Sequence, residues 1–272
     1  NQVDPLIQQE AVKGLPLTLT LIRQGQTIKE KIQPVKRKDG QNGTDRYFLG
    51  VYVEDPAAGV GTLTYYNPQT RQYGALGHKI VGFSNRELPL ANGKIVSARI
   101  TGINQGNRGE PGEKIGIFSG SNDIIGDISA NTPIGIFGSL RNGVTNPWHQ
   151  RPIPVSTISE VRPGPAEILT VLSGNEIRRF SIEIQKVYYQ TNLRDKGMVV
   201  KVTDSELLNQ AGGIIQGMSG SPIIQNGKLV GAITHVFVND PTRGYGVFAE
   251  WMLQMEETFG RTTQDVHPDL AS

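Results

Sequence analysis

Short apolar stretches recur along the chain, each rich in Val, Ile, Thr, Tyr and Phe. They are punctuated by 33 glycines and 16 prolines. This pattern is typical of many short strands in a barrel or sandwich, so we expect an all-β fold. The predicted strands are Leu17–Arg23, Phe48–Val53, Gly61–Tyr66, Ile95–Ile103, Lys114–Ser119, Pro133–Phe137, Glu167–Val171, Arg178–Val187, Val199–Val202, Ser221–Gln225, Leu229–Thr234 and Gly244–Phe248.

Few segments favour a helix or a defined turn. The predicted helices are Asp4–Lys13, Asp204–Gln210 and Glu250–Phe259. Thr203 or Asp204 could cap the second helix, and the third has an apolar face that includes Trp251, Leu253, Met255 and Phe259. Asn226-Gly227 between two apolar runs is the strongest short signal for a β-hairpin.

A change in composition predicts a domain boundary near Lys36–Arg46, where charged residues and glycines replace the strand pattern. We expect residues 1–36 to be the end of a larger module, because about 35 residues rarely close a core alone. Residues 37–46 would be a linker, residues 47–262 the main domain, and residues 263–272 a flexible tail.

Composition narrows the possible functions. The net charge is +2, and the short basic run Lys36-Arg37-Lys38 is better explained as a solvated linker than as a nucleic-acid site. The absence of cysteine excludes disulfides and thiolate zinc sites. No run approaches the roughly 18 apolar residues of a membrane span. The chain begins at Asn1, so we expect a processed or truncated product whose export signal or anchor lay upstream.

The segment Gly217-Met218-Ser219-Gly220-Ser221-Pro222 has the character of a nucleophile turn. Glycines near the serine expose its hydroxyl and let backbone N–H groups converge on an oxyanion. Such a serine needs a histidine base. Of the four histidines, His78 follows the small residues of Tyr73-Gly74-Ala75-Leu76-Gly77, which leave its imidazole unobstructed. His149 lies in a loop, His235 on a strand and His267 in the tail.

Longer blocks extend this pattern over residues 59–253. They are Gly59-Val60-Gly61-Thr62-Leu63-Thr64, Tyr73-Gly74-Ala75-Leu76-Gly77-His78, Asn131-Thr132-Pro133-Ile134-Gly135-Ile136-Phe137-Gly138, Gln216-Gly217-Met218-Ser219-Gly220-Ser221-Pro222 and Gly231-Ala232-Ile233-Thr234-His235-Val236-Phe237-Val238-Asn239-Asp240-Pro241. In these blocks the chain resembles the stage IV sporulation protein B family of serine peptidases, distant relatives of trypsin-like enzymes. The resemblance implies a two-barrel serine peptidase closed by the C-terminal helix.

The resemblance also assigns roles to individual residues. Ser219 would be the nucleophile and His78 the general base. The backbone N–H groups of Gly217 and Ser219 would form the oxyanion hole, while Ser221 is better explained as a turn residue. For the orienting acid the family pattern points to Asp204, which could equally be a helix cap. Asp127 and Asp123 are the alternatives.

Substrate-binding positions follow from the spacing in trypsin-like enzymes. The strand that pairs with the substrate would begin 15 residues after Ser219, at Thr234, His235 and Val236. Gly213 stands where trypsin has an acid, and Val236 stands where those enzymes keep a glycine. Met218 replaces an aspartate that other trypsin-like enzymes use for activation. These departures favour narrow specificity.

The resemblance implies a biological role as well. Family members are exported from the forespore into the space between its two membranes, where they cut themselves and a membrane-bound regulator of an intramembrane protease. That protease then activates a sigma factor. Residues 3–35 resemble the last part of a PDZ domain and lack its carboxylate-binding loop.

No cofactor or catalytic metal is expected, because the chain has no His-Glu-x-x-His motif and no carboxylate cluster. Nucleic acid is not expected as a partner either. The alternative function is a catalytically silent protease fold kept for binding, since a fold does not prove activity.

Overall fold

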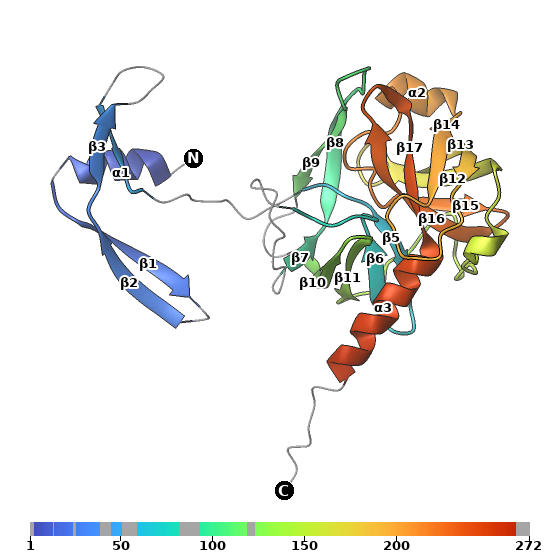
Figure 1. Cartoon of the computed structure of the whole chain (residues 1–272), viewed down its shortest axis with the longest axis horizontal. Coiled ribbons are helices and arrows are strands. Elements are labelled where there is room, and N and C mark those ends of the chain that lie inside the picture. The colour runs from blue at the N-terminus through green and yellow to red at the C-terminus, as the bar shows by residue number, and fades with distance from the viewer. Residues whose placement is uncertain are drawn as a thin grey trace, which may run out of the picture. The chain divides into compact units, whose positions relative to one another are not determined.

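The computed structural model describes residues 3–12, 14–23, 26–38, 45–50, 59–81, 93–118 and 123–264. The chain divides into two units, Asn1–Pro56 and Ala57–Ser272 (Figure 1). Strands dominate both units, as the sequence predicted.

The first unit contains one helix and two hairpins. Its elements are α1 (Val3–Ala11), β1 (Leu17–Arg23), β2 (Gln26–Ile32), β3 (Val35–Lys38) and β4 (Asp45–Phe48). The strands pair as β1–β2 and β3–β4, both antiparallel. The Gln8 side-chain amide both donates to Tyr47 O (2.8 Å) and accepts from Tyr47 N (3.0 Å), which fastens α1 to β4.

The linker expected over residues 37–46 does not match this arrangement. Two of the four β3–β4 pairs, Arg37 with Arg46 and Lys38 with Asp45, fall within the expected linker. The boundary between the units falls at Pro56. All four residues of Val35-Lys36-Arg37-Lys38 are exposed, so the sequence has no alternation of apolar and polar residues that would predict a strand. Beyond Phe48, residues 51–53 of the predicted strand Phe48–Val53 lie outside the described residues.

The second unit begins with an antiparallel sheet. Its order is β5 (Leu63–Tyr66), β6 (Gln72–Ala75), β11 (Gly135–Leu140), β10 (Ile124–Thr132) and β7 (Gly93–Val96). A separate hairpin joins β8 (Ala98–Asn104) to β9 (Glu113–Phe118). Among the described residues these strands form a five-stranded sheet and a hairpin, and with the barrel described next they make the all-β fold that the sequence predicted.

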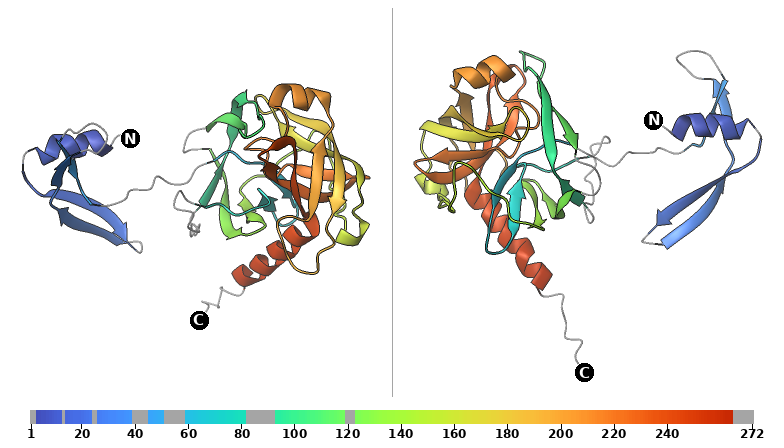
Figure 2. Two further views of the ribbon diagram at one scale, coloured as in Figure 1. Left: turned by 45° about the horizontal axis from the view of Figure 1, so that its top comes forward. Right: turned by 180° about the vertical axis from the view of Figure 1, so that it is seen from behind.

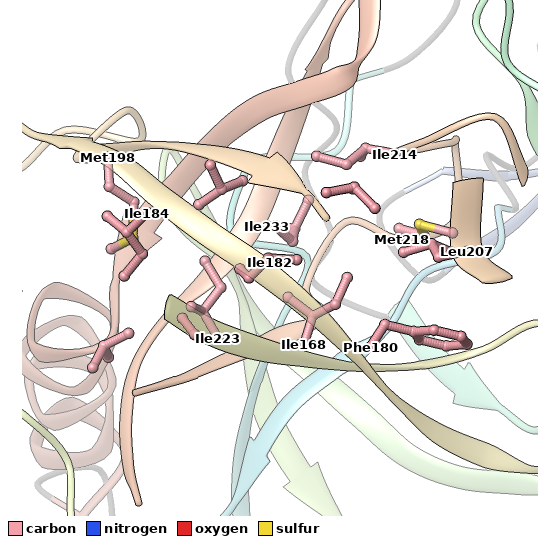
Figure 3. Packing of buried hydrophobic residues seen from close by; sticks show 14 of the residues in the cluster. Ile168, Phe180, Ile182, Ile184, Met198, Leu207, Ile214, Met218, Ile223 and Ile233 are labelled. Atoms are coloured by element: carbon pink, nitrogen blue, oxygen red, sulfur yellow. The ribbon is translucent and has the colours of Figure 1, made fainter. Parts of the chain in front are cut away.

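Six further strands close a barrel in the order β12 (Gly164–Val171), β13 (Ile177–Val187), β14 (Met198–Val202), β17 (Asp240–Phe248), β16 (Lys228–Phe237) and β15 (Pro222–Gln225). On β13, Phe180, Ile182 and Ile184 are buried and alternate with exposed residues, because successive strand side chains point to opposite faces. The buried set fills the barrel (Figure 3). Asn226 and Gly227, with φ of 52° and 73°, form the tight turn predicted between β15 and β16.

Helical segments complete this unit: η1 (Ile158–Glu160), α2 (Ser205–Ala211) and α3 (Ala249–Gln264). Figures 1 and 2 show α3 running from the end of β17 along the barrel and the sheet, and it contacts β16 and β6. Met252 of this helix is fully buried and packs with Ile134 and Phe137 of the sheet side and with Val247 of the barrel. The helix therefore joins the two β layers.

Replacing Met252 by alanine should lower the free energy of unfolding by about 2–5 kcal/mol, because the missing side chain leaves a cavity at this junction. Urea unfolding would measure the change. Gln254→Ala, at an exposed position of the same helix, should change it by less than about 0.5 kcal/mol. Equal effects for the two variants would contradict the junction role of Met252.

Candidate active site

The loop that carries His78 approaches the barrel at the end of β6. Leu76 and Gly77 both adopt positive φ (67° and 70°). A Cβ atom at Gly77 would lie 2.8 Å from Thr234 Cγ2 and 3.1 Å from Val247 Cγ1. Only a residue without a side chain fits there, so Gly77 is what brings His78 against β16.

The turn around Ser219 is held from the sheet side by two threonines. Thr62 N donates to Ser219 O (2.9 Å), and Thr62 Oγ1 donates to Gly217 O (2.9 Å). Thr64 Oγ1 donates to Gly220 O (2.8 Å). From the barrel side, Gly220 N donates to Ile233 O (2.8 Å). The serine turn is therefore clamped between the sheet and the barrel.

Ser219 and His78 line the same pocket, which has a volume of about 230 Å³. The other lining residues are Ile214, Ile215, Gln216, Thr234, His235 and Val236. The Ser219 hydroxyl donates to Thr234 O at 3.0 Å. Ser221, in contrast, is fully buried, and its Oγ has no hydrogen-bond partner among the described residues. The accessible hydroxyl of the turn is thus that of Ser219.

Two backbone N–H groups of this turn are available to a ligand. Met218 N donates to Ile215 O (3.1 Å) and Ser221 N donates to Met218 O (2.9 Å). Within the described part of the chain, the N–H groups of Gly217 and Ser219 have no acceptor. Such unpaired donors beside a nucleophile can stabilise a developing oxyanion. Met218 itself points into the barrel core, which explains an apolar residue at this position (Figure 3).

A backbone carbonyl orients His78. Its Nδ1 atom lies 2.9 Å from Lys79 O. A carbonyl oxygen can only accept, so Nδ1 must carry the proton in the neutral ring. The Nε2 lone pair is then free to act as a base.

None of the three predicted acids contacts His78. Asp204 caps α2: its Oδ1 accepts from Glu206 N (3.0 Å) and Leu207 N (3.1 Å). Of the two roles that the sequence left open for Asp204, the structure shows the helix cap. The sequence could not separate them because a cap and an orienting acid have the same local pattern. Asp127 forms an ion pair with Lys94, and Asp123 is exposed.

Asn131 is a residue whose role the sequence did not reveal. Its Oδ1 accepts from Ile80 N and its Nδ2 donates to Ile80 O, both at 2.8 Å. The side chain therefore fixes the backbone two residues after His78. Asn131 stands in one of the distinctive blocks of the sequence, which was the available signal.

His235 lies beside His78, with ring centroids 5.1 Å apart. Burial lowers the pKa of His235, and the nearby charge of His78 lowers it further, against the raising effect of Asp195. The Nδ1 atom of His235 is 3.9 Å from Asp195 Oδ2. A lowered pKa keeps His235 neutral at neutral pH, so it does not repel a protonated His78.

One edge of β16 is open next to the pocket. β15 pairs with β16 only as far as Ala232, whereas β17 pairs with it as far as Phe237. Among the described residues no strand covers positions 234–237 on the β15 side. An extended peptide can add to such an edge. Gly213 lies outside the pocket lining, and a Cβ atom there would lie 2.1 Å from Pro241 O.

Lys114 is a buried cation that the sequence did not single out. It lies on β9, is 6% exposed, and its Nζ donates to Thr170 Oγ1 at 2.7 Å. Burial lowers its pKa from 10.5 to about 7. Flanking residues on β9 are exposed, so a lysine there had the pattern of an ordinary surface position.

This buried amine predicts a pH dependence of stability. Between pH 7 and 10.5 the unfolded chain binds up to one proton more at Lys114 than the folded chain does. The free energy of unfolding should therefore rise with pH across this window, because stability rises wherever the unfolded state binds more protons. Urea midpoints of the wild type relative to Lys114→Met should increase from pH 7 to pH 9.5 or so. Parallel pH profiles would contradict the buried titration.

The described residues contain neither a membrane-spanning helix nor a cluster of metal-ligating side chains. No helix there is long and apolar enough to cross a membrane. No group of three or more His, Cys, Asp or Glu side chains in that part of the chain is placed to hold a metal ion.

Comparison with known proteins gives a family and two distant structures. The family model of SpoIVB peptidase S55 matches residues 45–253. The inactive form of the Rv3671c protease is similar with 14% identity over 53% of this chain and 72% of that chain, at a TM-score of 0.35. A serine-to-alanine mutant of Rv3671c from M. tuberculosis, also in an inactive form, has 13% identity over 54% of this chain and 71% of that chain, at a TM-score of 0.35. No curated protein matches. The family match includes every residue that lines the pocket.

Proposed function

The chain belongs to the SpoIVB peptidase S55 family and is a serine peptidase, and we propose that Ser219 and His78 carry its reaction. The observation that carries this proposal is that both side chains line one pocket, although 141 positions separate them (219 − 78). Fully buried Ser221 cannot serve in its place.

The proposed reaction is acyl transfer in two steps. The Ser219 hydroxyl turns from Thr234 O to His78, loses its proton to Nε2 and attacks the substrate carbonyl carbon. The N–H groups of Gly217 and Ser219 stabilise the oxyanion. His78 then gives the proton to the leaving amine, the C–N bond breaks, and water, activated by the same histidine, releases the acid and restores Ser219.

Lys79 O takes the place of the orienting carboxylate in this proposal. It fixes the tautomer of His78, as the third group of a triad does. A neutral carbonyl stabilises the imidazolium less than a carboxylate would, because it carries no charge. This favours a slow, selective processing enzyme over a digestive one.

Substrate would bind as an extended strand on β16 at Thr234, His235 and Val236, with a side chain in the pocket. Ile214, Ile215 and Val236 give that pocket, with a volume of about 230 Å³, an apolar wall that suits an apolar side chain. No acid stands at Gly213 to attract lysine or arginine.

Val236→Gly should therefore broaden the range of substrate side chains that the pocket accepts, because it removes an apolar wall of the pocket. We expect cleavage after Leu or Phe to gain roughly tenfold relative to cleavage after Ala, a typical value for a few methylene groups. A peptide library profiled by mass spectrometry would measure the ratio. An unchanged cleavage profile would show that Val236 does not determine which side chains the pocket accepts.

The wider role rests on family membership. We propose that the protein acts in a sporulation signalling pathway, where it is exported to the space between the forespore and mother-cell membranes. There it would cut itself and a membrane-bound regulator of an intramembrane protease, which leads to sigma factor activation. The first unit is proposed to be the end of a PDZ-like domain. Complementation of a sporulation mutant that lacks the family member would test this role, and an inactive variant that restores sporulation would refute it.

A fluorophosphonate probe tests the catalytic proposal directly. Mass spectrometry should find the adduct on Ser219 of the wild-type protein, and Ser219→Ala should carry none. The competing function, a silent protease fold used for binding, expects no adduct on the wild type. The Ser219 hydroxyl bonded to Thr234 O is compatible with either, so this measurement decides between them.

A further inference from the structure

Lys114 enters the barrel wall beside the proposed oxyanion hole. Its backbone N donates to Gln216 O (3.0 Å), and Gln216 N donates to Gly112 O (2.8 Å), which forms a short parallel bridge. On β9 the neighbours Glu113 and Ile115 are exposed, so Lys114 is the residue that turns inward. The strand thus attaches to the residue just before Gly217.

The aliphatic part of Lys114 packs directly against Gly217. A Cβ atom built on Gly217 would lie 3.1 Å from both Cβ and Cδ of Lys114. Gly217 has a φ of 90°, which favours glycine, and its N–H is one of the two unpaired donors. The position of this N–H therefore depends on where the lysine chain lies.

Beyond Gly217 the lysine ends at a single buried partner. Its Nζ donates to Thr170 Oγ1 on β12, and Thr170 is 1% exposed. Burial alone lowers its pKa, and no carboxylate of the described residues pairs with the amine. An apolar residue of similar volume at such a site is often neutral or stabilising. The stability of the barrel alone therefore does not explain a lysine here.

We propose that Lys114 is a positioning residue for the oxyanion hole. Its amine, anchored on Thr170, fixes the lysine chain, and that chain fixes the peptide group between Gln216 and Gly217. Because Nζ is bonded to Thr170, Lys114 acts through Gly217 and does not serve as the base. This inference rests on the proposed function, whose oxyanion hole it supports.

The test compares the kinetics of fluorophosphonate labelling, which separate the maximal inactivation rate from the probe's binding constant. Lys114→Met keeps an aliphatic side chain against Gly217 but loses the bond of the amine to Thr170. We expect its inactivation rate to be about tenfold lower than that of the wild type. This is less than the roughly 10²–10³-fold loss expected when an oxyanion-hole donor is removed. Lys114→Ala also loses the chain and should approach about a hundredfold. The binding constant of the probe should stay unchanged in both.

Three further measurements separate a positioning role of Lys114 from a general loss of structure in the variants. Thr170→Val should slow labelling as much as Lys114→Met, and the double variant should be no slower than either single variant, because one anchor is lost once. The unfolding midpoint of Lys114→Met should equal or exceed that of the wild type. Ile117→Ala, at a position of β9 that is 63% exposed, should label at the wild-type rate.

The outcomes are distinct. Wild-type rates in Lys114→Met and Lys114→Ala would overturn the positioning role, as would a loss explained entirely by weaker probe binding. A wild-type protein that forms no Ser219 adduct would overturn the proposed function and this inference with it.

Discussion

Replacing Ser219 by alanine is expected to lower the rate of peptide hydrolysis by about a million-fold, the scale seen when a serine peptidase loses its nucleophile. The reason is chemical: without the hydroxyl no acyl-enzyme can form. His78→Ala should cost a similar factor, and the double variant should be no slower, because the two side chains act as one unit. The rates would be measured with a peptide that the wild type cleaves from a library.

Ser221→Ala is the matched control for this prediction. Ser221 lies two residues from Ser219 on the same turn, is fully buried, and has a hydroxyl without a partner among the described residues. Its loss should leave the rate within about twofold and the stability equal or slightly higher, because an unpaired buried hydroxyl is costly. If Ser221→Ala were the inactive variant, the nucleophile would have to be reassigned.

Gly220→Ala should produce the largest effect on folding. The added Cβ would lie 2.0 Å from Thr62 O and 2.5 Å from Leu76 N, and both are backbone atoms that cannot easily move away. Gly220 also has a φ of 90°. We expect the free energy of unfolding to fall by about 3–5 kcal/mol. Activity should be lost even in the fraction that folds, because Ser219 would shift with its neighbour.

Gly227→Ala separates the effect of the positive φ from the effect of the close backbone contacts. Gly227 also has a positive φ, 73°, but nothing lies within 4 Å of a Cβ there. This variant should lose only about 1–2 kcal/mol, the cost of the left-handed backbone. Urea unfolding of both variants gives the comparison. Equal losses would mean that backbone conformation, not the approach of Thr62, limits position 220.

The sequence predicted the barrel better than the sheet. β13 and β16 have strong strand patterns, and the Asn226-Gly227 turn joins β15 to β16 as expected. β10 was missed because Asp127, Ser129 and Asn131 interrupt its apolar residues. β3 was missed because all of its residues are exposed. Strands of this kind are stabilised by their partners, and a local pattern does not contain the partner.

The candidate site was predictable where glycines expose a functional group, and not where distant residues meet. Ser219 and His78 stand in such segments, and the structure places them in one pocket. Asp204 was a different case, because a cap and an orienting acid have the same local sequence. The bond of Lys79 O to His78 and the packing of Lys114 on Gly217 have no sequence signature at all. Their catalytic roles remain predictions.

The threonine clamp on the serine turn also determines when activity can arise during folding. Thr62 and Gly217 are 155 positions apart, and Thr64 and Gly220 are 156 apart. Contacts between such distant positions form late, because the closure of a long loop costs entropy before the contact repays it. We therefore expect the nucleophile to become organised late in folding, after these distant segments have met.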